Sequence, residues 1–128
     1  MSAMTDYLEN ALANHVLRHV AYSSPAAVYV ALFTVAPGET GGGTEVSGGG
    51  YARQAVTFGA PSNGTVTNSA DVTFPVATAN WGTIVAFAIF DAATAGNMLI
   101  YGNLTSSKTV NSGDQFKFPA GQLQISFQ

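Results

Sequence analysis

The 128-residue chain contains no cysteine, and only 9% of its residues are charged. Without cysteine it can form neither disulfides nor thiolate metal sites. Its four basic residues, Arg18, Arg53, Lys108 and Lys117, are scattered along the chain and leave no basic stripe that could neutralise phosphates. No apolar run reaches the ~20 residues that a membrane-spanning helix needs. The sequence therefore predicts neither nucleic acid nor membrane as a partner.

The polar part of the chain consists mainly of Ser, Thr, Asn, Gln and Gly. A surface made of these residues is wetted by water, yet few charges must be desolvated when it meets a partner. This composition favours a protein that works inside a large assembly. The amino-terminal residues do not follow the pattern of a secretory signal, so we expect assembly in a cytoplasm.

Short apolar segments separated by turns predict a mainly β protein. Residues 83–90 are apolar at both alternating positions, which is typical of a central strand covered on both faces. Residues 28–34 show the same pattern, and Asn63-Gly64 is typical of a tight hairpin turn. We expect one antiparallel β-sandwich or jelly-roll-like domain over residues 1–128, with a turn at residues 105–108.

The last segment alternates regularly between apolar and polar residues. This alternation places Leu123, Ile125 and Phe127 on the inner face of a strand. We expect these three to share one core with Val30, Phe87 and Ile89.

Residues 6–20 are predicted to form the helix of an amino-terminal helical arm, residues 1–24. Asp6 is the expected cap, with Glu9 as its capping-box partner. His15 and His19 are four residues apart, a spacing that paired metal ligands use. A third ligand is missing from the pattern, so we expect no metal and place both rings against the sandwich or at a subunit contact.

Residues 37–50 form a long glycine-rich loop, which we expect to be held by partners because ordering so many glycines costs entropy. Arg53 follows this loop, and Glu45 is its nearest candidate partner. Pairing of the two would staple the loop to the sheet; direct contact of Arg53 with another protein is the alternative. The candidate partner-binding residues are Gly41, Gly42, Gly43, Glu45, Gly48, Gly49, Gly50, Tyr51, Arg53, His15, His19 and Trp81.

Catalytic constellations are not apparent. The carboxylates beyond the helix fall in loops or at strand ends with no pair spaced for acid–base work, namely Glu39, Glu45, Asp71, Asp91 and Asp114. Two histidines on one helix do not make a nucleophilic triad. We expect no enzyme activity and no cofactor. Tyr22, Tyr51, Trp81 and Tyr101 could form a sugar-stacking platform, but the sequence favours core and rim positions in the sandwich for them.

Several segments resemble a family of small virion proteins of tailed bacteriophages, including phages of cyanobacteria. The matching segments are Tyr7-Leu-Glu-Asn10, Val28-Tyr-Val-Ala-Leu-Phe-Thr34, Gly43-Thr-Glu-Val-Ser-Gly-Gly-Gly-Tyr-Ala-Arg-Gln54, Val72-Thr-Phe-Pro-Val-Ala-Thr-Ala-Asn-Trp-Gly82 and Ile89-Phe-Asp-Ala-Ala93. Members are often labelled phage tail fibre protein, and similar β-sandwich modules serve as capsid cement or baseplate proteins. The resemblance implies a non-enzymatic structural protein of the virion, assembled in the host cytoplasm.

Among these roles the sequence favours a capsid decoration or cement protein, because repeats, coiled coils and a β-shaft that could build a long fibre are absent. Such a protein would bind the major capsid protein lattice as a homo-oligomer, for which we expect a trimer. A tail-fibre or baseplate adaptor is the alternative, followed by a module that binds host glycans.

Overall fold

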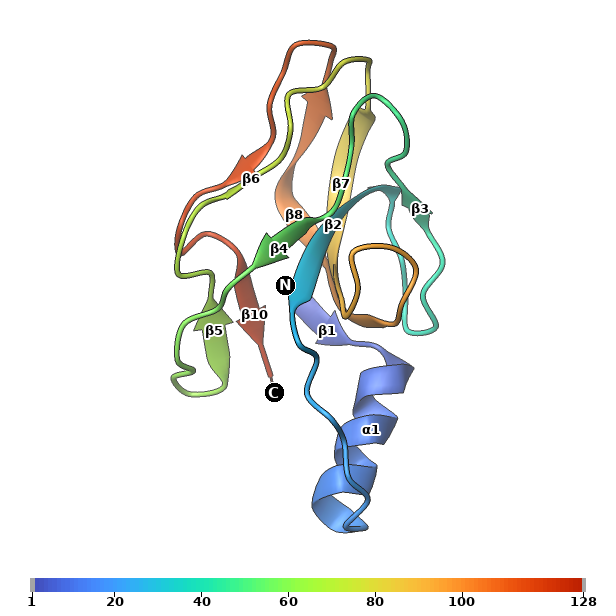
Figure 1. Cartoon of the computed structure of the whole chain (residues 1–128), viewed down its shortest axis with the longest axis vertical. Helices are drawn as coiled ribbons and strands as arrows, with labels where there is room; N and C mark the ends of the chain where they lie inside the picture. Colours follow the sequence, from blue (N-terminus) through green and yellow to red (C-terminus); the bar gives the residue numbers. More distant parts are fainter. Residues whose placement is uncertain (1, 128) are drawn as a thin grey trace.

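The computed structural model describes residues 2–127, and its central element is strand β7, Gly82–Phe90 (Figure 1). Antiparallel neighbours flank it, β2 (Val28–Val35) on one side and β8 (Met98–Val110) on the other. Strand β1 (Ser2–Met4) extends the sheet beyond β8, and both β3 (Thr44–Glu45) and β4 (Gln54–Val56) pair with β2. The predicted central strand is confirmed.

Two small antiparallel sheets form the opposite layer. Strand β5 (Thr65–Thr67) pairs with β10 (Gln124–Ser126), and β6 (Val72–Thr73) pairs with β9 (Lys117–Phe118). The main core contains residues of both layers, among them Val30, Leu32, Phe87, Ile89, Phe74, Phe118, Leu123 and Ile125. The mainly β, antiparallel sandwich expected from the sequence is therefore present.

The other face of the large sheet is apolar as well. Its buried side chains are Ala31, Phe33, Ala86, Ala88 and Phe90, with Val85, Met98 and Tyr101 packed against them. The small side chains of Ala86 and Ala88 face this thinner cluster, whereas their larger neighbours Phe87 and Ile89 face the main core. This explains why β7 is apolar at both alternating positions.

Two expectations about the later strands are wrong. Phe127 is 39% exposed and lies one residue beyond β10, which ends at Ser126, although its amide still donates to the carbonyl of Gly64, the next position in the register with β5. Residues 105–108 do not form a turn, because β8 continues through a bulge. Asn103 pairs with Ala86 and Lys108 pairs with Ile84, so β8 has extra residues between two positions that are only two apart on β7. A bulge absorbs the polar Ser and Thr residues without ending the strand.

The tight turn at residues 62–65 has the predicted chemistry. Asn63 and Gly64 have φ values of 53° and 76°, and Ser62 and Thr65 exchange backbone hydrogen bonds of 2.9 and 3.0 Å. Positive φ at both central positions is the mark of the hairpin turn that Asn-Gly favours.

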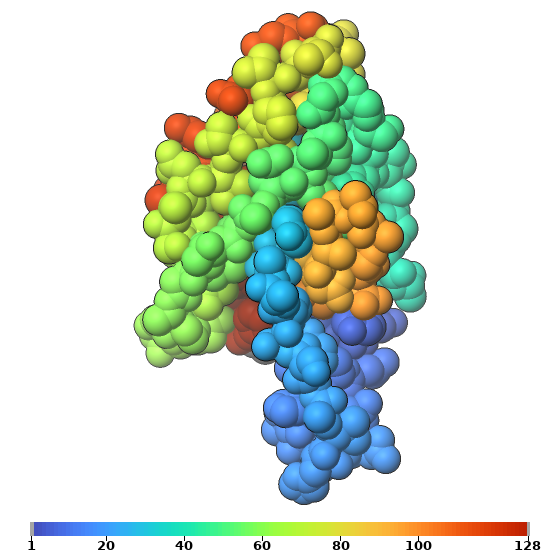
Figure 2. Space-filling view, in the orientation of Figure 1, coloured from blue at the N-terminus to red at the C-terminus, as the bar shows by residue number. Residues whose placement is uncertain are grey.

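The helix α1 covers Asp6–Leu17 and is shorter than expected at its end. Its cap is Thr5, not Asp6: the Thr5 hydroxyl accepts from the Leu8 amide at 3.4 Å and donates to the Met98 carbonyl at 2.7 Å. His19 has a φ of 59°, which takes it out of the helix and lets the Val20 amide donate to the Asn14 carbonyl at 3.0 Å. The arm projects from one end of the molecule (Figures 1 and 2).

Residues 37–50 are ordered by the chain itself, so the expectation that partners hold this loop is wrong. Strand β3 lies within it and pairs with β2, and Val46 is buried with its amide donating to the Leu32 carbonyl at 3.0 Å. Positive φ values at Gly41–Gly43 and Gly48–Gly50 allow the chain to return to the sheet on either side of β3. Within the described residues, no helix is long and apolar enough to cross a membrane.

Candidate partner-binding surface

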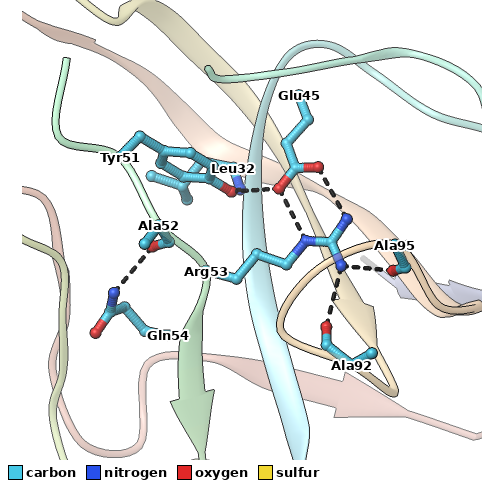
Figure 3. Close-up of polar contacts among 8 residues, drawn as sticks. All are labelled: Leu32, Glu45, Tyr51, Ala52, Arg53, Gln54, Ala92 and Ala95. Carbon is cyan, nitrogen blue, oxygen red and sulfur yellow. Dashed lines mark hydrogen bonds and ion pairs between the residues drawn. The ribbon is translucent and has the colours of Figure 1, made fainter. Parts of the chain in front are cut away.

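Arg53 makes four side-chain hydrogen bonds within the molecule (Figure 3). Its Nε and Nη2 atoms donate to the two carboxylate oxygens of Glu45 at 2.9 and 3.0 Å, and Nη1 donates to the carbonyls of Ala92 and Ala95 at 3.0 and 2.8 Å. Its guanidinium carbon lies 3.6 Å from the centre of the Phe90 ring. The predicted pairing with Glu45 is confirmed, and the side chain ties β4, β3 and the turn after β7 together.

Tyr51 completes this Glu45–Arg53 network. Its hydroxyl donates to Glu45 Oε2 at 2.7 Å and accepts from the Leu32 amide at 3.0 Å (Figure 3). Burial, and next the hydrogen bond to Glu45, raise the pKa of Tyr51 far above its ordinary value. The phenol therefore stays a neutral donor to Glu45.

Trp81 is an interior residue. Only 6% of it is exposed, its ring meets that of Tyr51 edge-on at 5.4 Å, and its indole Nε1 donates to the Gly49 carbonyl at 2.9 Å. A Cβ at Gly49 would lie 2.9 Å from the same nitrogen. Tyr51 and Trp81 thus lie in the core and cannot present an exposed platform for sugars.

The candidate residues that remain at the surface are glycines in both halves of the loop and the two histidines of the arm. At Gly41, Gly42 and Gly48 an added Cβ would meet nothing within 4 Å. Gly41–Gly43 line a hollow of about 530 Å³ together with Phe33, Phe90, Met98, Asp6 and Glu39. We call it the loop-side hollow; it has an apolar floor and an acidic rim.

Three exposed carboxylates meet beside this hollow, and the sequence analysis missed them as a group. Asp6 and Glu9 lie on the first turn of α1, and Glu39 comes from the loop; one oxygen of each lies within 4.8 Å of the others. The Asp6 amide donates to the Glu39 carbonyl at 2.9 Å, which brings loop and helix together. Spacing on the helix could suggest Asp6 and Glu9, but nothing local in the sequence points to Glu39. Such oxygens are the ligands that hard cations prefer.

The mutual proximity of these carboxylates changes their titration. A side-chain hydrogen bond with Glu39, followed by desolvation and the charge of Glu39, raises the pKa of Asp6. The charge of Glu39 is also the largest cause of the raised pKa of Glu9, and the hydrogen bond from the Tyr101 hydroxyl to Glu39, 2.7 Å long, raises the pKa of Tyr101. The acidic cluster Asp6, Glu9 and Glu39 is thus a site of concentrated negative charge.

His15 and His19 do not share a helical face, contrary to the expectation. His15 is in the last turn of α1, and its Nδ1 lies 3.3 Å from the Val20 carbonyl, whereas His19 is beyond the helix in a left-handed conformation. Both are exposed. Their positions are at the outer end of the arm, where Val16 and Leu17 are 65% and 76% exposed.

A second hollow runs along β8. It measures about 910 Å³ and is lined by the bulge of β8, by β9 and β10, and by the two lysines Lys108 and Lys117. We call it the lysine groove. Its two lysines outnumber its carboxylate, Glu9, whereas the charged residues that line the loop-side hollow are all acidic, so the two hollows would favour different partners.

Comparison with known proteins gives one family. Residues 3–126 match the family model described as podophage GP4 fiber I protein gp80. No curated protein matches the chain.

Proposed function

The chain belongs to the podophage GP4 fiber I protein gp80 family, a family of phage structural proteins, and from that membership we propose that it is a structural module of a phage fibre. The family description favours the tail-fibre alternative over the capsid decoration role that the sequence alone favoured. The absence of a shaft-building pattern fits a module that attaches to a fibre and does not itself supply the fibre's length.

This proposal rests on the contrast between the body, in which the loop is packed against the sandwich, and the arm, whose apolar end is exposed. The Glu45–Arg53 network and the buried Trp81 hold the loop against the sandwich without help from another chain. The arm leaves Val16, Leu17 and Val20 at 65%, 76% and 45% exposure. A rigid body with one apolar projection is suited to attachment, not to catalysis.

The test uses phage particles that lack this protein. For a fibre module, the mutant particles should retain their genome on heating as well as wild-type particles do, but should adsorb poorly to host cells. Imaging of wild-type particles with the protein labelled should place it on the fibres. Genome leakage on mild heating with normal adsorption, and label on the head, would instead establish a capsid decoration protein.

A point variant separates attachment from folding. Leu17→Asp removes an exposed apolar group of the arm without disturbing the interior, and Lys108→Glu is the matched control on the lysine groove. We expect Leu17→Asp protein to be folded but depleted from purified particles, with the control retained. Equal retention of both variants would show that the arm does not attach the module.

A further inference from the structure

We propose that the tip of the arm, residues 14–20, docks into the loop-side hollow of a second copy of this chain. The proposal concerns contacts between copies and does not depend on where in the virion the protein is located. Four observations carry it: the exposure of the tip, the reach of the helix, the shape of the hollow and the charges of the two surfaces.

The tip lacks a covering in the single chain. Leu8 is the one buried residue of α1 and lies at its base, while Val16 and Leu17 at the far end are largely exposed. A helix of 12 residues is marginal in water unless an apolar face is packed. Contact with another surface would therefore stabilise the outer half of α1.

The tip cannot reach the hollow of its own chain. Thr5, Asp6 and Tyr7, at the start of α1, line that hollow. The helix then runs outward over about 18 Å, at about 1.5 Å for each residue, and the tip points away from the body (Figures 1 and 2). Only the hollow of another copy is open to it.

The hollow matches the tip in size and in polarity. The half-buried Met98 and the buried Phe33 and Phe90 line it, and about 530 Å³ is room for the side chains of one helical turn. A whole helix, about 10 Å wide, does not fit, so the tip would insert side chains and lie across the opening.

Charge selects this hollow over the lysine groove. The tip carries Arg18 beside His15 and His19 and has no carboxylate, while the hollow has Asp6 and Glu39 on its rim. In the single chain the Arg18 guanidinium contacts only the Asn14 amide oxygen, at 3.0 Å, among the described side chains. The lysine groove carries Lys108 and Lys117 against one carboxylate, Glu9, and is therefore less favourable to Arg18.

The two surfaces lie at different places on the chain, so every copy both gives an arm and receives one. Reciprocal exchange closes a dimer, and passage in one direction closes a ring such as the trimer expected from the sequence.

The experiment is a charge exchange read by self-association. The purified full chain is studied by sedimentation velocity and light scattering over a range of concentrations, with circular dichroism as the check on folding. We expect wild-type protein to associate, and Arg18→Glu and Glu39→Lys each to weaken association by about tenfold or more. The double variant Arg18→Glu, Glu39→Lys should recover affinity to within about threefold of wild type, because the pair is restored with reversed sign. Lys108→Glu is the matched control and should associate like wild type.

Leu17→Asp provides a variant that does not touch the body or the acidic cluster. It should remain folded and lose association, which keeps the test decisive even where Glu39→Lys does not fold. Wild-type protein that stays monomeric up to about 1 mM would overturn the proposal and leave the arm to a different virion protein. Association that persists in Leu17→Asp, or a folded double variant without recovery, would overturn it as well.

Discussion

Carboxylates take part in two polar clusters of this molecule, and the two clusters are built in opposite ways. At the Glu45–Arg53 network, one carboxylate receives three hydrogen bonds from Arg53 and Tyr51. At the base of the arm, Asp6, Glu9 and Glu39 share a small volume, and neither of the two ion pairs found among the described residues includes them. The first carboxylate is neutralised by folding, and the three others are not.

This difference separates what holds the fold from what remains for a partner. A buried ion pair stabilises only when its geometry and its extra hydrogen bonds offset desolvation, and Arg53 meets that condition with four hydrogen bonds and the Phe90 ring. Exposed carboxylates within 4.8 Å of one another repel instead. A positively charged group of a partner would therefore add stability at the base of the arm, whereas at the network Arg53 already supplies that charge.

Loss of Arg53 should have the largest effect on stability. Arg53→Ala leaves Glu45 poorly solvated and two carbonyls without their donor, so we expect the free energy of unfolding to fall by about 2–4 kcal/mol in urea denaturation. Arg53→Lys should recover only part of this, because an ammonium cannot bind both carboxylate oxygens and both carbonyls. Arg18→Ala, at an exposed arginine, is the control and should change little; a loss for Arg53→Ala as small as that of the control would show that the network does not hold the fold.

The two ends of the arm should respond differently to truncation of a leucine. Leu8 is 6% exposed and belongs to the main core, so Leu8→Ala should cost about 2–4 kcal/mol in urea denaturation. Leu17→Ala, at 76% exposure, should change the stability of the dilute protein by less than about 0.5 kcal/mol. Similar losses at both positions would mean that the outer turn also packs against the body.

The sequence predicted the parts of the fold whose pattern is local. Apolar residues at both alternating positions predicted the central strand, and regular alternation predicted the inward positions of Leu123 and Ile125. The pair Asn63-Gly64 predicted the hairpin turn. Phe127 followed the same alternation but lies past the end of β10, and periodicity does not show where a strand ends. The end of α1 was misplaced because His19 adopts a left-handed conformation, which is uncommon at any residue other than glycine.

The candidate site was predicted in part, for a related reason. Glu45 and Arg53 are eight residues apart and are the natural partners in a chain with few charges, so their pairing could be inferred. The acidic cluster joins Glu39 to a helix that begins more than thirty positions earlier, and only the folded arrangement of loop and arm brings them together. The glycine-rich loop was thought to need partners because its entropy cost is visible in sequence, whereas the contacts of Val46 and Trp81 that offset it are not.

Two neighbouring glycines of the loop at residues 37–50, which the Glu45–Arg53 network holds, can be substituted as a matched pair. Gly48 and Gly49 both have positive φ, 73° and 59°, but a Cβ at Gly48 meets open space and one at Gly49 meets the Trp81 indole. Gly48→Ala should cost about 1 kcal/mol from backbone strain alone. Gly49→Ala should cost about 1–2 kcal/mol more, with a changed Trp81 fluorescence, because the side chain has to shift. Equal costs with unchanged fluorescence would show that the loop does not rest on Trp81.

The smallest effect is expected from relief of repulsion in the acidic cluster. Glu39 is the largest cause of the raised pKa of both Asp6 and Glu9. A carboxyl group with a raised pKa binds its proton more tightly in the folded state, so stability is lost as the pH rises from below the unfolded values of 3.8 and 4.5 through the folded ones. Glu39→Gln keeps an acceptor for the Tyr101 hydroxyl and leaves the first turn of α1 unchanged.

This variant should lower the pKa of Asp6 and Glu9 in a carboxyl NMR titration and raise Tm slightly at pH 7. The comparison at pH 3 is its internal control: there the carboxyl groups are protonated in both proteins, so the difference in Tm should vanish. A Glu39→Gln protein that is less stable than wild type at pH 7 would show that Glu39 stabilises the folded chain through Tyr101 more than it repels Asp6 and Glu9. In that case the acidic cluster would already be balanced by folding, as the Glu45–Arg53 network is.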